Sequence, residues 1–211
     1  MNDCFAQLDL PRRPWLESEM VKKAFLKLAA DCHPDRFQQS AVSEREAAHQ
    51  RYTDLNEANA CLTNPQSRLR HFLELERGGR LNDLREIPDD LMTLFSEIAQ
   101  AIRSVDDFLK KRSLATSPLM KAMLMEEGGT HQPELDRLSK TLQQRTEVLE
   151  ETMKRIDAAL EANSVSNATS RDELLSELES VHRLASFQDR WLAQLREKSM
   201  ALIGYTLSVH K

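Results

Sequence analysis

Apolar side chains recur every three or four residues along most of the chain, and this spacing constrains the fold more than any other feature. A step of three or four residues returns to the same face of an α-helix, whereas a half-buried strand needs strict alternation. No run of alternating β-branched residues is present, and only five of the 211 residues are glycine. The sequence therefore predicts an all-α protein in which each helix buries one apolar stripe.

The second half of the chain contains the longest helical patterns. Between residues 88 and 112, apolar side chains step by four and three residues and form a heptad seam of Leu91, Phe95, Ile98, Ile102, Val105 and Leu109. Two further long helices are expected over residues 134–162 and 170–202. Three long helices in succession predict an antiparallel three-helix bundle packed knobs into holes. The Met-rich segment at residues 119–125 receives no role from this pattern.

The first part of the chain predicts a smaller helical hairpin. One helix begins near Glu17 and ends near Cys32, because the residue before Pro34 avoids helical backbone geometry. Ser43 followed by Glu46 is the pattern of a capping box, which predicts the start of the next helix after a short loop.

The end of this hairpin region is also marked. Asn64 followed by Pro65 is typical of the start of a helix, and Gly78 is suited to its end. These signals divide the chain into a hairpin domain at residues 1–79 and a helical bundle at residues 86–211.

Charge, hydropathy and cysteine content exclude several classes of function. The net charge is −5, which argues against a general nucleic-acid binder. No apolar run is long enough to span a membrane, and the first residues lack a signal-peptide pattern. Cys4, Cys32 and Cys61 are odd in number and lack CxxC spacing, so we expect no disulfide framework, no metal site and no cofactor. A reduced cytoplasmic location fits this cysteine usage.

The turn after the first helix carries more than a turn requires. Pro34 fixes the backbone, and Asp35 then presents a carboxylate that can pair with an arginine of a partner. His33 can hydrogen-bond in either protonation state. Basic side chains on the preceding helix lie off its apolar stripe, where they can steer an acidic partner surface. These are Lys22, Lys23 and Lys27.

With its flanking segments, this turn resembles the J-domain family of co-chaperones. The resemblance rests on the segments VKKAFLKLAADCHPDRF and LNEANACLTNPQSR. It implies that the chain stimulates the ATPase of a DnaK/HscA-type chaperone and performs no chemistry itself. It also implies a chaperone-binding site made of His33, Pro34, Asp35, Arg36, Lys22, Lys23 and Lys27. Leu26, Asp31 and Cys32 depart from the family pattern and make the basic face thinner than usual.

Further segments are similar to the HscB family of J-type co-chaperones. They are LPRRPWL, HPDRF and NPQSRLRHFLEL in the first part, and LASFQDRWLAQLREK near the end. This resemblance implies that the helical bundle binds an iron–sulfur cluster scaffold protein as its client. Met92 and Phe108 lie off the heptad seam, so we expect them to form an exposed apolar patch for the client.

Other interpretations stay open on the sequence alone. The chain could be a J-domain co-chaperone for a different client, or a helical adaptor without a chaperone role. An enzyme with Cys32 as nucleophile and His33 as base is weaker, because sequence neighbours rarely face each other. A metal site made of Cys32, His33 and Asp35 is equally weak, because these residues are too close in sequence to converge on one ion.

Overall fold

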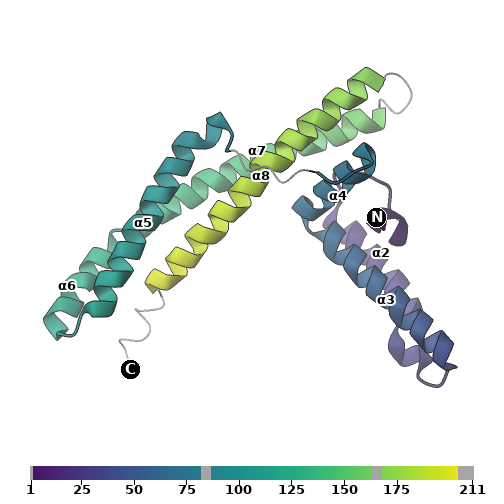
Figure 1. Ribbon diagram of the computed structural model, residues 1–211, viewed down its shortest axis with the longest axis horizontal. Helices are drawn as coiled ribbons and strands as arrows, with labels where there is room; N and C mark the ends of the chain where they lie inside the picture. The colour runs from purple at the N-terminus through teal and green to yellow at the C-terminus, as the bar shows by residue number, and fades with distance from the viewer. Residues whose placement is uncertain (1, 82–86, 163–167, 204–211) are drawn as a thin grey trace. The chain divides into compact units, whose positions relative to one another are not determined.

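The computed structural model describes residues 2–81, 87–162 and 168–203, and all regular elements within these ranges are helices (Figure 1). Contacts divide the chain into two compact units. One comprises Met1–Asp83 with Glu151–His182, and the other comprises Leu84–Glu150 with Arg183–Lys211. The prediction of an all-α fold is confirmed. No described helix combines the length and the apolar character needed to cross a membrane.

The first unit is built around a helical hairpin. Helices α2 (Ser18–Asp31) and α3 (Val42–Thr63) lie side by side and are joined through the 3-10 turn η1 (Pro34–Phe37) (Figure 1). The short helix α1 (Cys4–Gln7) packs on α3. Helix α4 (Pro65–Arg77) comes directly after α3 in the chain and also packs on it. The fully buried side chains of this region include Phe5, Leu8, Val21, Leu55, Ala58, Leu62 and Leu73.

Both ends of α4 follow the sequence signals. The Oδ1 atom of Asn64 accepts a hydrogen bond from the backbone N–H of Ser67 at 2.9 Å, and Pro65 occupies the first helical position. Gly78 has φ = 67°, the left-handed conformation that glycine adopts without strain. The predictions of the start and the end of this helix are confirmed.

The start of α3 differs from the sequence prediction. Ala41 holds the cap position, and an alanine side chain has no oxygen to accept a hydrogen bond from the first turn. Ser43 and Glu46 lie inside the helix, so the predicted capping box is wrong. The backbone carbonyl of Ala41 accepts from the N–H groups of Glu44 and Arg45, both at 3.1 Å, and the helix begins without a side-chain cap.

A buried aspartate connects the linker at residues 11–16 to the part of α7 (Gln132–Ala162) that belongs to the same unit. Asp157 is only 3% exposed. Its carboxylate accepts from Arg13 Nε at 3.1 Å, from Arg13 Nη2, and from the backbone N–H of Trp15 at 3.4 Å. One helical turn earlier, Lys154 Nζ lies 4.6 Å from the ring centre of Trp15, a cation–π contact. The linker is therefore held by charge as well as by packing.

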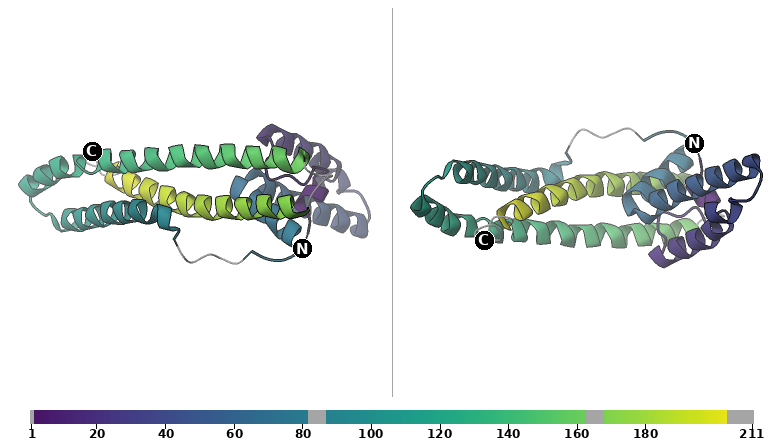
Figure 2. Two further views of the ribbon diagram at one scale, coloured as in Figure 1. Left: turned by 90° about the horizontal axis from the view of Figure 1, so that it is seen from above. Right: turned by 90° about the horizontal axis from the view of Figure 1, so that it is seen from below.

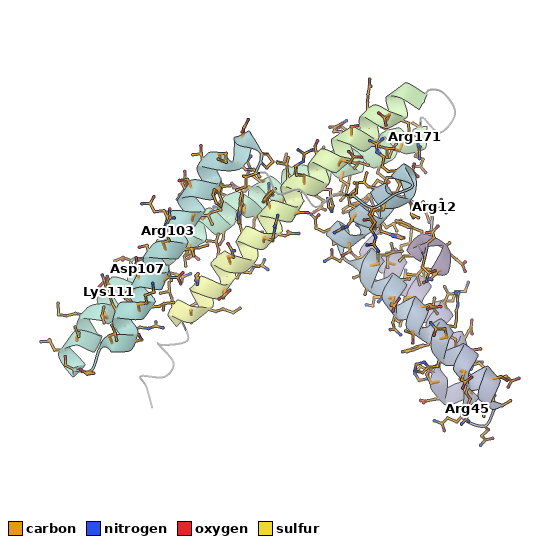
Figure 3. The ribbon with its side chains drawn as sticks, in the orientation of Figure 1. Arg12, Arg45, Arg103, Asp107, Lys111 and Arg171 are labelled. Carbon is orange, nitrogen blue, oxygen red and sulfur yellow. The ribbon has the colours of Figure 1, made fainter. Side chains whose placement is uncertain are left out.

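Surface arginines add further ion pairs within this unit. Arg77, at the end of α4, donates from Nε to Glu179 at 2.6 Å and from Nη1 to Asp172, both on α8 (Ala168–Ile203). Arg171, labelled in Figure 3, donates from Nη2 to Glu76 at 2.6 Å. Acceptance of these hydrogen bonds by Glu179 and Asp172 raises the pKa of Arg77 above its ordinary value. Because solvent reaches these pairs, each contributes less than about 1 kcal/mol.

The second unit is the helical bundle. Helix α5 (Met92–Leu114) follows the 3-10 turn η2 (Asp89–Leu91) and packs with the first part of α7 and the last part of α8, which run alongside it (Figure 2). The Met-rich segment forms an additional helix, α6 (Pro118–Gly129), with Leu124 in the core and Met120 and Met123 exposed. The core of the bundle includes Leu91, Ile98, Val105, Leu135, Leu138, Leu142, Trp191 and Leu195.

The buried stripe of α5 has a different phase from the predicted heptad seam. Leu94 is 8% exposed, whereas its neighbour Phe95, which the seam placed in the core, is 37% exposed. Phe108 is 3% exposed, whereas Leu109 is only half-buried. Leu94 and Phe95 are both apolar, and so are Phe108 and Leu109. The sequence is therefore equally consistent with either phase. The phases share Leu91, Ile98 and Val105, which are all buried.

Phe108 is therefore not part of an exposed patch, and that prediction is wrong. Its ring packs against the ring of His131, with the ring centres 5.2 Å apart. The solvent face of α5 carries charged residues instead, of which Arg103, Asp107 and Lys111 are labelled in Figure 3.

We expect Asp157→Ala to lower the melting temperature of the full chain by roughly 4–8 °C, because about 2 kcal/mol is lost at about 2–4 °C per kcal/mol. The change leaves Arg13 and the Trp15 N–H without their buried acceptor. Circular dichroism measures the transition. Asp172→Ala removes a carboxylate that is 65% exposed and serves as the matched control, with a much smaller shift. Equal shifts for both variants would contradict the importance of the buried carboxylate.

Candidate functional site

The candidate site is the loop between α2 and α3 together with the exposed face of α2. Helix α2 ends at Asp31, and His33 has extended backbone angles (φ −60°, ψ 130°), as expected for the residue before a proline. Pro34 is the first residue of η1, and the carbonyl of His33 accepts from the N–H of Arg36 at 3.0 Å. The proline thus ends one helix and begins the next turn, as the sequence predicts.

His33 holds the loop and leaves the carboxylate of Asp35 accessible. The Nδ1 atom of His33 accepts a hydrogen bond from the backbone N–H of Asp35 at 3.3 Å. The His33 ring packs edge-on against Tyr52 of α3, with ring centres 5.5 Å apart. The side chain of Asp35 is 75% exposed, and Gln38 Nε2 donates to it over a long 3.4 Å. A carboxylate this exposed can accept both nitrogens of an incoming arginine.

Arg36 stabilises the loop through contacts with the end of α2. Its Nη1 atom donates to the backbone carbonyl of Ala30 at 2.8 Å, which satisfies one of the carbonyls left open at the end of α2. The same nitrogen lies 3.4 Å from the carboxylate of Asp31. The structure therefore gives Arg36 a bracing contact, and the chaperone-binding role implied by the resemblance stays a prediction.

The α2 face, which we define as Lys22, Lys23, Leu26 and Lys27, is exposed to solvent. Lys22 Nζ lies 3.8 Å from Glu19, a surface pair that contributes little. No ion pair to Lys23 or Lys27 is found among the described residues. Leu26 is 56% exposed between the lysines. This combination offers an acidic partner both charge and a small apolar contact.

The loop does not have the geometry of a nucleophile and its base. Cys32 is 8% exposed, and its Sγ atom lies 3.5 Å from the carbonyl of Leu28 on its own helix. The thiol is directed back onto α2. The His33 ring instead accepts a hydrogen bond from the N–H of Asp35 and packs against Tyr52. The arrangement therefore gives no support to the enzyme interpretation.

The predicted client-binding residues are in different environments of the bundle. Met92 begins α5 and is 51% exposed, whereas Phe108 is in the core. Phe95, one turn after Met92, is partly exposed and packs on Trp191 with ring centres 5.8 Å apart. Sequence reasoning missed Phe95 as a surface residue. The alternative heptad phase, which buries Leu94, was the signal that could have revealed it.

Comparison with known families and relatives gives a consistent result. Residues 3–71 match the DnaJ domain, a region that includes the loop and the α2 face. A co-chaperone protein HscB homolog from Mannheimia succiniciproducens is 29% identical over 98 residues, which cover 46% of this chain and 57% of that relative. The homolog from Haemophilus influenzae is 25% identical over 130 residues, covering 56% of this chain and 75% of the relative. The chain thus spans little more than half the length of the first relative.

Two solved structures share the fold. The chaperone HscB from Vibrio cholerae aligns with a TM-score of 0.53 over 98% of this chain and 99% of that chain. The human co-chaperone protein HscB aligns with a TM-score of 0.54 over 94% of this chain and 81% of that chain. Sequence identity is 16% in both comparisons, so these likenesses concern the fold alone.

Residues 3–71 match the DnaJ domain, and the relatives of this chain are named as co-chaperones. The chain is similar to the HscB co-chaperones, in sequence over about half its length and in fold over nearly all of it. The resemblance inferred from the loop and its flanking segments is confirmed. The division into domains at residues 1–79 and 86–211 stays a prediction, and residues 82–86 lie outside the described ranges.

Proposed function

We propose that this chain stimulates the ATPase of a DnaK/HscA-type chaperone and delivers a client to it. The client is an iron–sulfur cluster scaffold protein, and the outcome is cluster assembly or transfer in the cytoplasm. The observation that carries the proposal is the exposed carboxylate of Asp35, held by His33 and Pro34 next to the α2 face. The relatives named as co-chaperone protein HscB homologs support the co-chaperone role, and the choice of client rests on the resemblance of the sequence to the HscB family.

The mechanism is docking rather than catalysis by this chain. The lysines of the α2 face attract an acidic surface of the ATPase and raise the rate of encounter. Asp35 then pairs with an arginine of the ATPase and favours the conformation that hydrolyses ATP. The bundle binds the client at the same time, so weak binding at each site is strengthened by the covalent connection between the sites.

Two other functions are alternatives to this proposal. A J-domain co-chaperone for another client would use the same loop with a different bundle surface. A helical adaptor would bind partners without changing ATP hydrolysis. The experiments below separate these possibilities, because they measure ATPase stimulation and client binding independently.

We expect His33→Gln and Asp35→Asn each to lower ATPase stimulation at least about tenfold in steady-state assays with the DnaK/HscA-type chaperone of the same organism. Because the side chain of Asp35 is 75% exposed and that of His33 is 45% exposed, we expect unfolding free energies to change by no more than about 0.5 kcal/mol. His49→Gln on α3 and Asp107→Asn on α5 make the same chemical changes at exposed positions and should preserve stimulation. Full stimulation by both loop variants would mean that the loop is only a turn.

Charge reversal on the α2 face tests the steering role. Lys23→Glu and Lys27→Glu should slow association with the ATPase several-fold at low salt, measured by stopped-flow fluorescence. The difference should shrink as salt rises, because the Debye length falls from about 10 Å at 0.1 M to about 3 Å at 1 M. Lys140→Glu, an exposed residue of α7, gives the same change in net charge. Equal slowing by this control would assign the effect to net charge rather than to the α2 face.

Client binding is tested with the full chain and the purified scaffold protein by isothermal titration calorimetry. Met92→Glu should weaken binding about tenfold, or about 1.4 kcal/mol, because it replaces an exposed apolar side chain at the start of α5 with a charge. Met200→Glu changes a methionine of α8 that is 71% exposed and should bind as the unaltered chain does. Absence of scaffold binding by a chain that still stimulates the ATPase would favour a different client.

A further inference from the structure

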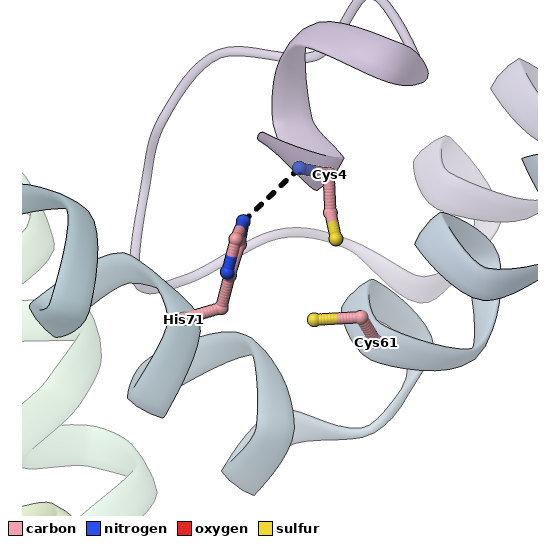
Figure 4. A group of neighbouring side chains, drawn as sticks. All are labelled: Cys4, Cys61 and His71. Atoms are coloured by element: carbon pink, nitrogen blue, oxygen red, sulfur yellow. Dashed lines mark hydrogen bonds between the residues drawn. The ribbon is translucent and has the colours of Figure 1, made fainter. Parts of the chain in front are cut away.

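A second group of reactive side chains lies on the first unit, away from the loop. Cys4 of α1, Cys61 of α3 and His71 of α4 face one another (Figure 4), and their sulfur and nitrogen atoms all lie within 4.8 Å of one another. Cys61 lies near the C-terminal end of α3, which begins at Val42 next to the loop. At 1.5 Å per residue, the group is about 28 Å along the helix axis from the loop end.

The group is held by contacts that leave the two sulfur atoms near each other. The Nε2 atom of His71 accepts a hydrogen bond from the backbone N–H of Cys4 at 3.0 Å (Figure 4), so the imidazole is neutral. The His71 ring stacks on Phe5, with ring centres 5.7 Å apart, and His71 is 7% exposed. Asp3 caps α1 by accepting from the N–H of Phe5 at 3.0 Å, which fixes the backbone around Cys4.

Two thiols and one neutral imidazole are a ligand set that zinc prefers. Zinc–sulfur bonds of about 2.3 Å and zinc–nitrogen bonds of about 2.1 Å place tetrahedral ligand atoms about 3.5–3.8 Å apart. Separations within 4.8 Å therefore require side-chain movements of about 1 Å or less, with His71 exchanging its hydrogen bond to Cys4 for the metal. A disulfide between Cys4 and Cys61 would use the two sulfurs but would give no role to the third converging ligand.

We propose that Cys4, Cys61 and His71 bind one zinc ion, with a water molecule in the fourth position. Zinc binding releases one proton from each thiol to solvent and joins α1 to the region where α3 and α4 meet. Because ligands on separate elements bind zinc together only in the folded chain, zinc should stabilise this unit. The cysteine spacing alone gave no sign of this site, since its three ligands become neighbours only through the packing of α1, α3 and α4.

The test uses the untagged full chain, reduced with a phosphine so that no added thiol competes for metal. Cobalt(II) serves as a spectroscopic probe, and zinc affinity is measured by competition with a chromophoric chelator. We expect one cobalt ion per chain with a thiolate-to-cobalt charge-transfer band, displacement of cobalt by zinc, and a rise in melting temperature with zinc. Cys4→Ser and Cys61→Ser should each lose more than about tenfold in zinc affinity and weaken the charge-transfer band.

Cys32→Ser is the matched control, because the thiol of Cys32 bonds back onto α2 and its loss should leave zinc binding unchanged. Circular dichroism checks that each serine variant keeps its helical content, and Cys4→Ser provides a test at a short surface helix if Cys61→Ser does not fold. The proposal is overturned if the reduced chain binds no stoichiometric metal, or if both serine variants bind it as the unaltered chain does. Formation of a Cys4–Cys61 disulfide by a chain that binds no zinc when reduced would also overturn it.

Discussion

The linker at residues 11–16 is held by two buried charged side chains, and the packing of the first unit depends on these contacts. Arg68 of α4 is 2% exposed and donates from Nε to the carbonyl of Pro14 at 3.1 Å and from Nη1 to the carbonyl of Leu62 at 2.7 Å. Asp157 of α7 accepts from Arg13 and Trp15, the residues on either side of Pro14. Because this segment is not helical, these side chains supply hydrogen bonds that a regular helix would make internally.

Stability and the candidate function involve different residues of this unit. The side chains that fix the fold are buried, as Arg68 and Asp157 are, whereas Asp35 and the lysines of the α2 face are exposed. Within the loop, Pro34 supplies the backbone geometry through its fixed φ, and His33 and Arg36 add side-chain contacts. The chemistry presented to a partner can therefore change without a large change in folding free energy.

The sequence predicts local features of this protein better than features that depend on packing. Pro34, Asn64 and Gly78 act through their own backbone preferences, so the helix boundaries next to them follow directly from the sequence. The phase of α5 does not, because Leu94 and Phe95 are both apolar and only contacts with other helices decide which is buried. The convergence of Cys4, Cys61 and His71 is likewise invisible in sequence spacing, since it is created by three elements packing together.

The hairpin of α2 and α3 is packed unevenly along its length, and this bears on how the loop works. The buried residues of α3 are Ala48, Leu55, Ala58 and Leu62, so the larger side chains lie in its later turns, and η1 buries none. Low burial near a loop lowers the free energy of local opening. His33, packed edge-on against Tyr52, and Arg36, bonded to Ala30, limit this freedom. The loop end can thus adjust to a partner, while the opposite end of the hairpin, next to α1 and α4, keeps the unit folded.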